Sequence, residues 1–118
     1  GEGLGRKLGA PTANISVGDE QLPPDGVYAV AATIGEETKE HRGVANLGVR
    51  PTVDGERRLL EVHLLDFDGD LYGNMVEVCF GMRLRKEQKF EGCEELKEQI
   101  QRDLEQVREL FEERKAGT

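Results

Sequence analysis

The sequence predicts a mainly β domain with a single C-terminal helix, because two different periodicities meet near Phe90. Before that residue, short apolar runs alternate with turn residues, which is typical of an all-β domain. After it, apolar residues recur every three or four positions, which is typical of an amphipathic helix. A chain of 118 residues has the length of one domain. We therefore expect a single domain over residues 1–118, with a closed barrel or sandwich over about residues 1–90 and a helix over about residues 93–116.

Four segments before Phe90 have the composition of strands. They are residues 26–34, 42–49, 59–66 and 75–84. Glycine, proline and aspartate, which favour turn conformations, mark the connections at residues 22–26, 35–37, 54–55 and 68–70. This spacing favours short strands joined by tight turns over alternating α/β units.

The third predicted strand separates its side chains by chemistry. Leu60, Val62 and Leu64 alternate with Glu61 and His63, so the apolar and polar residues point to opposite faces. A carboxylate and an imidazole on one face could act as a base and its orienting group, or could form an exposed polar face.

The fourth predicted strand carries a similar alternation. One face is expected to hold Val76, Val78, Phe80, Met82 and Leu84, and the other Glu77, Cys79, Arg83 and Arg85. Two arginines could grip an anionic or planar ring system, because guanidinium is both a donor fork and a stacking surface. They could equally form solvated ion pairs with Glu77 or Glu87.

The C-terminal segment has one apolar stripe, formed by Leu96, Ile100, Leu104, Val107 and Phe111. Acidic residues near its start and basic residues near its end complement the helix dipole. We expect this helix to pack on the outside of the β domain, although a partner-binding helix has the same pattern.

Charge and cysteine content limit the function classes. Acidic residues outnumber basic ones by 24 to 16, for a net charge of -8, which argues against nucleic-acid binding. No apolar run is long enough to span a bilayer, so no membrane contact is expected. Cys79 and Cys93 lack companions for a zinc set and are expected to be reduced thiols. These features together predict a cytoplasmic protein.

The N-terminal segment is the best candidate for a binding site. Glycines at Gly3, Gly5 and Gly9, with the neighbouring Lys7, could form a nest of backbone N–H groups for phosphate oxygens. Beyond Pro11, the oxygens of Thr12 and Asn14 suit a hard cation such as Mg²⁺. The spacing fits neither a Walker A loop nor a dinucleotide fingerprint, and a frayed glycine-rich arm remains the alternative interpretation.

Five sequence segments in a fixed order resemble the riboflavin kinase family over nearly the whole chain. They are Gly-Glu-Gly-Leu-Gly-Arg-Lys-Leu-Gly at residues 1–9 with Pro-Thr-Ala-Asn-Ile at 11–15, Leu-Pro-Pro-Asp-Gly-Val-Tyr at 22–28, Gly-Val-Ala-Asn-Leu-Gly-Val-Arg-Pro-Thr at 43–52, Leu-Glu-Val-His-Leu-Leu-Asp-Phe at 60–67 with Leu-Tyr-Gly at 71–73, and Leu-Arg-Lys-Glu-Gln-Lys-Phe at 84–90. The bacterial form, in which this module is the C-terminal half of a bifunctional FAD synthetase, looks most similar.

The resemblance implies a six-stranded antiparallel Greek-key barrel with a C-terminal α-helix. It implies a riboflavin kinase, which converts riboflavin and ATP to FMN and ADP with Mg²⁺, or with Zn²⁺ or Mn²⁺. It also implies a natural fusion to an FMN adenylyltransferase domain, with small molecules rather than nucleic acid or membranes as partners.

The resemblance also implies roles for particular residues. Thr12 and Asn14 would bind the ATP phosphates and the metal, and Glu61 would be the catalytic base for the ribityl 5′-hydroxyl. Arg85 and Glu87 would lie beside the flavin. The remaining binding positions are Gly3, Gly5, Lys7, Gly9 and Pro11 in a flap over the nucleotide, and Asn46 on the nucleotide side.

The sequence departs from the family pattern in two places. Ala10 stands where the family usually has a bulky apolar residue, which would alter flap packing or nucleotide affinity. The family's first strand would precede Gly1, so we expect that strand to be missing from this chain and an exposed sheet edge in its place. A non-catalytic flavin- or nucleotide-binding barrel and a protein-interaction barrel are the alternative functions.

Overall fold

A computed structural model of the protein describes residues 12–16, 22–67 and 74–116. These residues form the strands β1 (Thr12–Ser16), β2 (Gly26–Ile34), β3 (His41–Thr52), β4 (Gly55–Leu64) and β5 (Val76–Arg85), followed by the helix α2 (Cys93–Ala116). The predicted flap positions Gly3, Gly5, Lys7, Gly9 and Pro11 lie outside this part of the chain, as does the predicted turn at residues 68–70. Within the described part, no helix combines the length and apolar character needed to span a bilayer.

The strands form one antiparallel sheet in the order β1-β4-β3-β2-β5. β3 and β4 are a hairpin whose turn at Val53 and Asp54 is closed by the pairing of Thr52 with Gly55. Gly55 has φ of 140°, a conformation that residues with a Cβ rarely adopt. The prediction of a mainly β antiparallel domain with a C-terminal helix is confirmed. Among the described residues β1 and β5 are the two edges of the sheet, and no pairing joins them into a barrel.

The predicted bounds are confirmed for β2 and for α2. The hairpin differs most, because β3 continues to Thr52 and β4 already begins at Gly55. Its outer end is exposed on both faces and carries charged residues, so it lacks the apolar alternation by which strands were predicted. β1 was not among the predicted strands, since five residues dominated by Thr, Asn and Ser give a weak strand signal.

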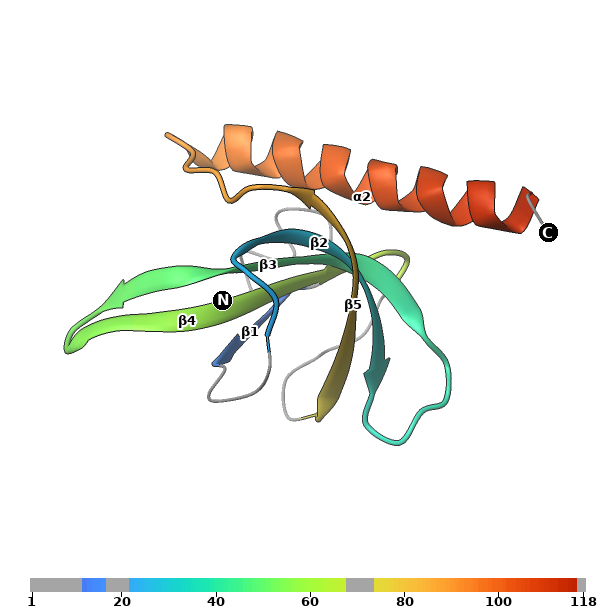
Figure 1. Cartoon of the computed structure of the whole chain (residues 1–118), viewed down its shortest axis with the longest axis horizontal. Coiled ribbons are helices and arrows are strands. Elements are labelled where there is room, and N and C mark those ends of the chain that lie inside the picture. Colours follow the sequence, from blue (N-terminus) through green and yellow to red (C-terminus); the bar gives the residue numbers. More distant parts are fainter. Residues whose placement is uncertain (1–11, 17–21, 68–73, 117–118) are drawn as a thin grey trace.

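The two faces of the sheet bury different apolar clusters. One face carries a cluster that includes Tyr28, Leu47 and Val62, with Leu60 and Leu64 of β4 beside them. The other face packs against α2, and there Val27 and Val44 contact Ile100, Leu104 and Val107. Figure 1 shows α2 lying across this second face. The predicted packing of the helix on the outside of the β domain is therefore confirmed.

The prediction of one continuous apolar face along β5 is wrong. Val76, Val78 and Phe80 pack on the first cluster as expected, but Leu84 packs on the α2 side and Met82 is 57% exposed. The β2–β5 register shifts between Val27 and Val30, and an irregularity of this kind inverts the alternation beyond it. Leu84 and Arg85 consequently lie next to α2.

Candidate active site

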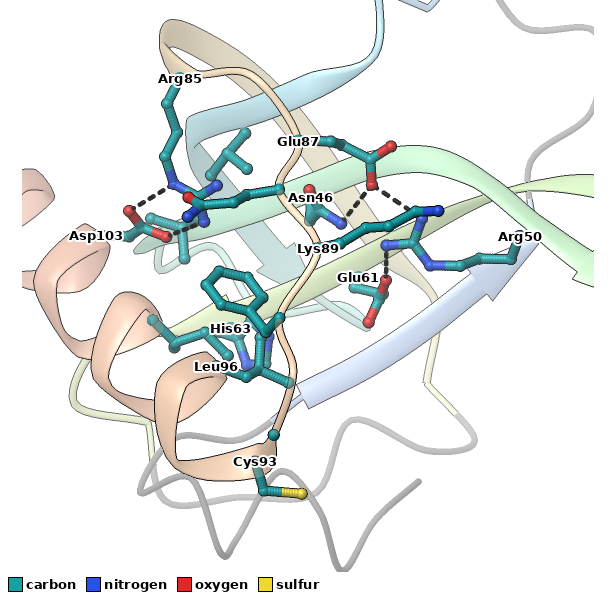
Figure 2. Close-up of a pocket in the computed structure, with 16 residues that line it drawn as sticks. Asn46, Arg50, Glu61, His63, Arg85, Glu87, Lys89, Cys93, Leu96 and Asp103 are labelled. Carbon is teal, nitrogen blue, oxygen red and sulfur yellow. Dashed lines mark hydrogen bonds and ion pairs between the residues drawn. The ribbon is translucent and has the colours of Figure 1, made fainter.

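A pocket of about 740 Å³ lies between the sheet and α2. Its walls come from β2, β3 and β4, from the end of β5, from the segment 86–92 and from the first three turns of α2. Apolar side chains such as Val27, Val44, Leu96 and Ile100 line it together with charged ones. Figure 2 shows how segment 86–92 passes in front of the sheet before α2 begins. A concave site of this size with a few convergent polar groups is typical of small-molecule binding.

Strand alternation supplies the polar side of the pocket. Asn46 and Arg50 lie at alternate positions of β3, and Glu61 and His63 at alternate positions of β4. The residues on either side of Glu61, Leu60 and Val62, are buried on the other face of the sheet. The predicted separation of the two sets on the third strand is thus confirmed, and the polar set lines a pocket instead of open solvent.

Two carboxylates in the pocket share one arginine. Arg50 donates to Glu61 Oε1 through Nη2 at 2.7 Å and to Glu87 Oε2 through Nη1 at 2.9 Å. Asn46 Nδ2 donates to the same Glu87 oxygen at 2.9 Å. Burial lowers the pKa of Arg50, but its hydrogen bonds and attraction to Glu87 and Glu61 outweigh this effect, so its pKa is raised above the usual value. The guanidinium therefore stays charged at every pH at which the protein folds.

A second ion pair connects the end of β5 to α2. Arg85 donates to both oxygens of Asp103, through Nε at 3.1 Å and Nη2 at 2.8 Å. Gln99 Nε2 also donates to Asp103 Oδ1 at 3.0 Å. Asp103 is almost fully buried, so this bidentate pair fixes the helix to the strand at the edge of the pocket. Figure 2 shows it on the opposite side of the pocket from Arg50.

His63 lies in the pocket wall and is 7% exposed. Its Nδ1 is buried without a hydrogen-bond partner among the described residues. Burial lowers the pKa of His63 because it disfavours the imidazolium form, and this outweighs the opposing attraction of Glu61 and Asp103. The imidazole is therefore neutral at pH 7.

The backbone of β1 runs directly beside this polar wall. In the antiparallel register, Thr12 is the Cα partner of His63 and Asn14 is the partner of Glu61. On the other side of β4, the partner of Glu61 is Asn46. Two sequence motifs that are far apart in the chain thus meet at Glu61.

Several of the predicted site residues come together here. Asn46, Glu61, Arg85 and Glu87 all line the pocket, and the register brings the backbone of Thr12 and Asn14 alongside. Arg85 is held by Asp103 and Glu87 by Arg50 and Asn46, so neither side chain projects freely into the cavity.

Arg50 and Asp103 were not singled out from the sequence. Arg50 lies one residue beyond the predicted strand at 42–49, but β3 continues to Thr52, so the alternation from Asn46 places both residues on one face. Asp103 interrupts the apolar stripe of α2 beside Leu104, and an acid on a buried helix face needs a partner.

The arrangement combines an apolar cleft, two carboxylates held by one permanent cation, and a neutral imidazole. A carboxylate in such a position can accept a proton from a bound hydroxyl. The cleft can take a planar ring between aliphatic walls, and the polar groups at its rim can orient it.

Comparison with known proteins identifies related chains. The family model described as riboflavin kinase (flavokinase) matches residues 1–111. The bifunctional riboflavin kinase/FMN adenylyltransferases of Escherichia coli K12 and Haemophilus influenzae are 49% and 46% identical over 111 residues, which cover 94% of this chain. The RNA-binding riboflavin kinase RibR of Bacillus subtilis is 42% identical over 113 residues and 95% of this chain.

The chain spans only part of these relatives. The matched region makes up 35% of the E. coli protein, 36% of the H. influenzae protein and 48% of RibR. A crystal structure described as a macrolide-efflux protein from Streptococcus pneumoniae superposes with a TM-score of 0.76 and 36% identity, over 92% of this chain and 35% of that chain.

Proposed function

The chain belongs to the riboflavin kinase family, and from this premise we propose that it transfers the γ-phosphoryl group of ATP to the ribityl 5′-hydroxyl of riboflavin. The products are FMN and ADP. The observation that carries the proposal is the meeting of two motifs in one pocket. Asn14 of β1 is in register with Glu61 of β4, and Glu61 lines a cleft of a size suited to a small organic ligand.

In this proposal Glu61 is the general base. Its carboxylate accepts the proton of the 5′-hydroxyl while the hydroxyl oxygen forms a bond to the γ-phosphorus. The bond from that phosphorus to the β–γ bridging oxygen breaks, and the bridging oxygen leaves with the electron pair as part of ADP. Positioning and charge neutralisation carry most of the catalysis in such a transfer, so one well-placed base among fixed charges is sufficient.

The pocket supplies the flavin site in this proposal. The isoalloxazine ring lies between the aliphatic walls, near Arg85 and Glu87 at the start of segment 86–92. Asn46, which lies across the sheet from Asn14 with Glu61 between them, faces the nucleotide side. The flap positions Gly3, Gly5, Lys7, Gly9 and Pro11 would cover the ATP phosphates.

A divalent cation fits the residue types at β1. Thr12 and Asn14 offer a hydroxyl and an amide oxygen, and their backbone is adjacent to Glu61 and His63 in the sheet. Mg²⁺ prefers oxygen ligands and is commonly held by one or two protein groups together with substrate phosphates. When bound there, the ion would neutralise phosphate charge; Mn²⁺ and Zn²⁺ are the alternatives.

The remaining parts of the proposal concern the module as a whole. A sixth strand between the β1 and β5 edges would close the sheet into the expected Greek-key barrel. In nature the chain would be joined to an FMN adenylyltransferase domain, as the names of the bifunctional relatives suggest. Its two free thiols, Cys79 and Cys93, suit a cytoplasmic protein.

A direct assay tests the function. The purified chain is incubated with riboflavin, ATP and Mg²⁺, and FMN is separated from riboflavin by chromatography. We expect FMN to form, and we expect Glu61→Gln to lower turnover by about 10²–10⁴-fold, because the variant cannot accept the proton. The control is Glu56→Gln, which changes an exposed carboxylate of the same strand and is expected to leave turnover unchanged.

Two different results would contradict the proposal, one for the kinase activity and one for the role of Glu61. Flavin binding without any FMN formation, even at high protein concentration, would favour a non-catalytic flavin-binding domain. Normal turnover of Glu61→Gln would remove Glu61 from the role of base and leave the kinase activity standing.

A further inference from the structure

Arg50 is the central member of a three-residue chain, Glu61–Arg50–Glu87, which we name the Arg50 bridge. Its guanidinium contacts the two carboxylates through different nitrogens, Nη2 toward Glu61 and Nη1 toward Glu87. The three residues come from β4, β3 and segment 86–92, so the bridge crosses the polar wall of the pocket. Figure 2 shows both carboxylates pointing toward the guanidinium.

At the outer end of the bridge, the Glu87 carboxylate lies against Gly48 of β3. A Cβ at Gly48 would overlap the Glu87 carboxylate, so only glycine at this position lets that carboxylate lie against the strand. Asn46, two residues before Gly48, donates to the Glu87 oxygen that Arg50 also contacts. Glu87 is therefore a fixed anchor, and Arg50 is held between it and Glu61.

The three side chains of the bridge are only partly exposed, with side-chain exposures of 37% for Arg50, 29% for Glu61 and 28% for Glu87. A lone ion pair at this exposure would contribute little to stability. Two carboxylates arranged around one planar donor fork give more, because each bond fixes the orientation of the fork for the other. The bridge is better suited to fixing geometry than to stabilising the fold.

We propose that Arg50 is a positioning residue that holds the Glu61 carboxylate in the orientation required of the base. This inference rests on the proposed kinase function. Arg50 binds Oε1 of Glu61, which leaves Oε2 as the oxygen that would accept the hydroxyl proton. A free glutamate side chain rotates about its last torsion, whereas a carboxylate held through one oxygen presents the other in a defined direction.

Arg50 does not itself take the proton. Its pKa is raised above the usual value, so it remains a donor throughout turnover. A misplacement of a reacting group by about 1 Å can lower a rate by about 10²-fold. Loss of the bridge should therefore lower kcat while the flavin cleft, which is formed mainly by other residues, keeps its affinity.

The test compares variants of Arg50 that keep its positive charge with variants that remove it, since both lose the two hydrogen bonds of the guanidinium to Glu61 and Glu87. Arg50→Lys keeps a positive charge, but a single ammonium group cannot reproduce two bonds in the plane of a guanidinium. We expect kcat for FMN formation to fall by about 10²-fold in both Arg50→Lys and Arg50→Gln, with the KM for riboflavin within about threefold of the original. Methylguanidinium added to an Arg50→Ala variant is expected to restore part of kcat, and methylammonium is not.

Two further variants act on the anchor and leave Arg50 in place. Gly48→Ala displaces the Glu87 carboxylate, and Glu87→Gln removes its charge, so each should lower kcat less than loss of Arg50 does. Combined with Arg50→Gln, neither should lower kcat further, because the bridge is already lost. The matched control is Arg57→Gln, an exposed arginine in register with Arg50 across the β3–β4 hairpin, which should keep full activity.

The outcomes are distinguishable. Absence of FMN formation by the unaltered chain would overturn the proposed function, and this inference with it. If the unaltered chain is active and Arg50→Lys retains full kcat, charge alone suffices and the positioning role is wrong. The same conclusion follows if Arg50→Gln raises KM and leaves kcat unchanged, since the arginine would then only bind substrate.

Discussion

The buried histidine in the pocket wall, His63, makes the stability of the fold depend on pH. Its imidazole is 7% exposed, and burial lowers its pKa below the usual 6.5. Between the folded and the unfolded pKa, the unfolded chain binds a proton that the folded chain does not. The free energy of unfolding therefore rises with pH through this window. The contribution is complete above about pH 6.5 and is lost as the pH falls toward the folded pKa.

Urea unfolding between pH 5 and pH 7 measures this effect. We expect the unaltered chain to become less stable as the pH is lowered from 6.5, and His63→Gln to show a flatter dependence because it has no imidazole to protonate. Equal slopes in His63→Gln and the original chain would assign the pH dependence to other groups.

At the scale of residues, the sequence predicted single side chains better than their partners. Glu61 could be selected because it lies between apolar residues on one strand, which is local information. Arg50 joins that glutamate to Glu87 through contacts between three separate segments, and no local pattern encodes such a contact. The helix pattern shows that Asp103 needs a partner, but it does not show that the partner is Arg85, which lies on a strand.

The link between β5 and α2 determines how firmly the helix is held against the pocket. Asp103→Ala leaves the Arg85 guanidinium without its bidentate partner, and removing one member of a buried pair costs about 3 kcal/mol. We expect urea unfolding to report a loss of that size. Arg108→Gln, which breaks the exposed pair between α2 and Asp66, is the control and should have a far smaller effect. Similar losses for both variants would contradict a special role for the buried pair.

At the scale of elements, predictability follows the strength of the local pattern. β2 and α2 were predicted with correct bounds because apolar residues mark them throughout. The sequence of β1 and of the charged end of the hairpin around Glu56 and Arg57 lacks the apolar alternation that predicts a strand. These segments are strands because their backbones pair with neighbouring strands, not because they bury apolar side chains. The inverted alternation near Met82 was not predictable, because it arises from an irregular pairing with β2.

The whole molecule should be stabilised by its proposed substrate. A ligand that binds only the folded state, at 100 times its Kd, adds about 2.7 kcal/mol to the free energy of unfolding. We therefore expect saturating riboflavin to raise the Tm, measured by circular dichroism, by several degrees. An unchanged Tm would contradict flavin binding by the pocket.

A matched pair of leucines on α2 tests where the ligand binds. Leu96 and Leu110 are both half-buried, but only Leu96 lines the pocket. Tryptophan at position 96 would fill part of the cleft, so Leu96→Trp should reduce the Tm increase that riboflavin causes. Leu110→Trp should retain that increase, and an equal reduction in both variants would argue for a binding site elsewhere.

The register of β1 against β4 has a consequence for how the protein acquires activity as it folds. Asn14 and Glu61 become neighbours only when a long loop closes, a step that is slow because of its entropic cost, whereas α2 can form from contacts within a few residues. Helical signal should therefore appear during refolding before FMN formation does. A slip of one residue in β1 would turn its residues to the opposite face and leave the overall secondary structure almost unchanged. Recovery of turnover is consequently a stricter reporter of correct refolding than any spectroscopic measure of helix or strand content.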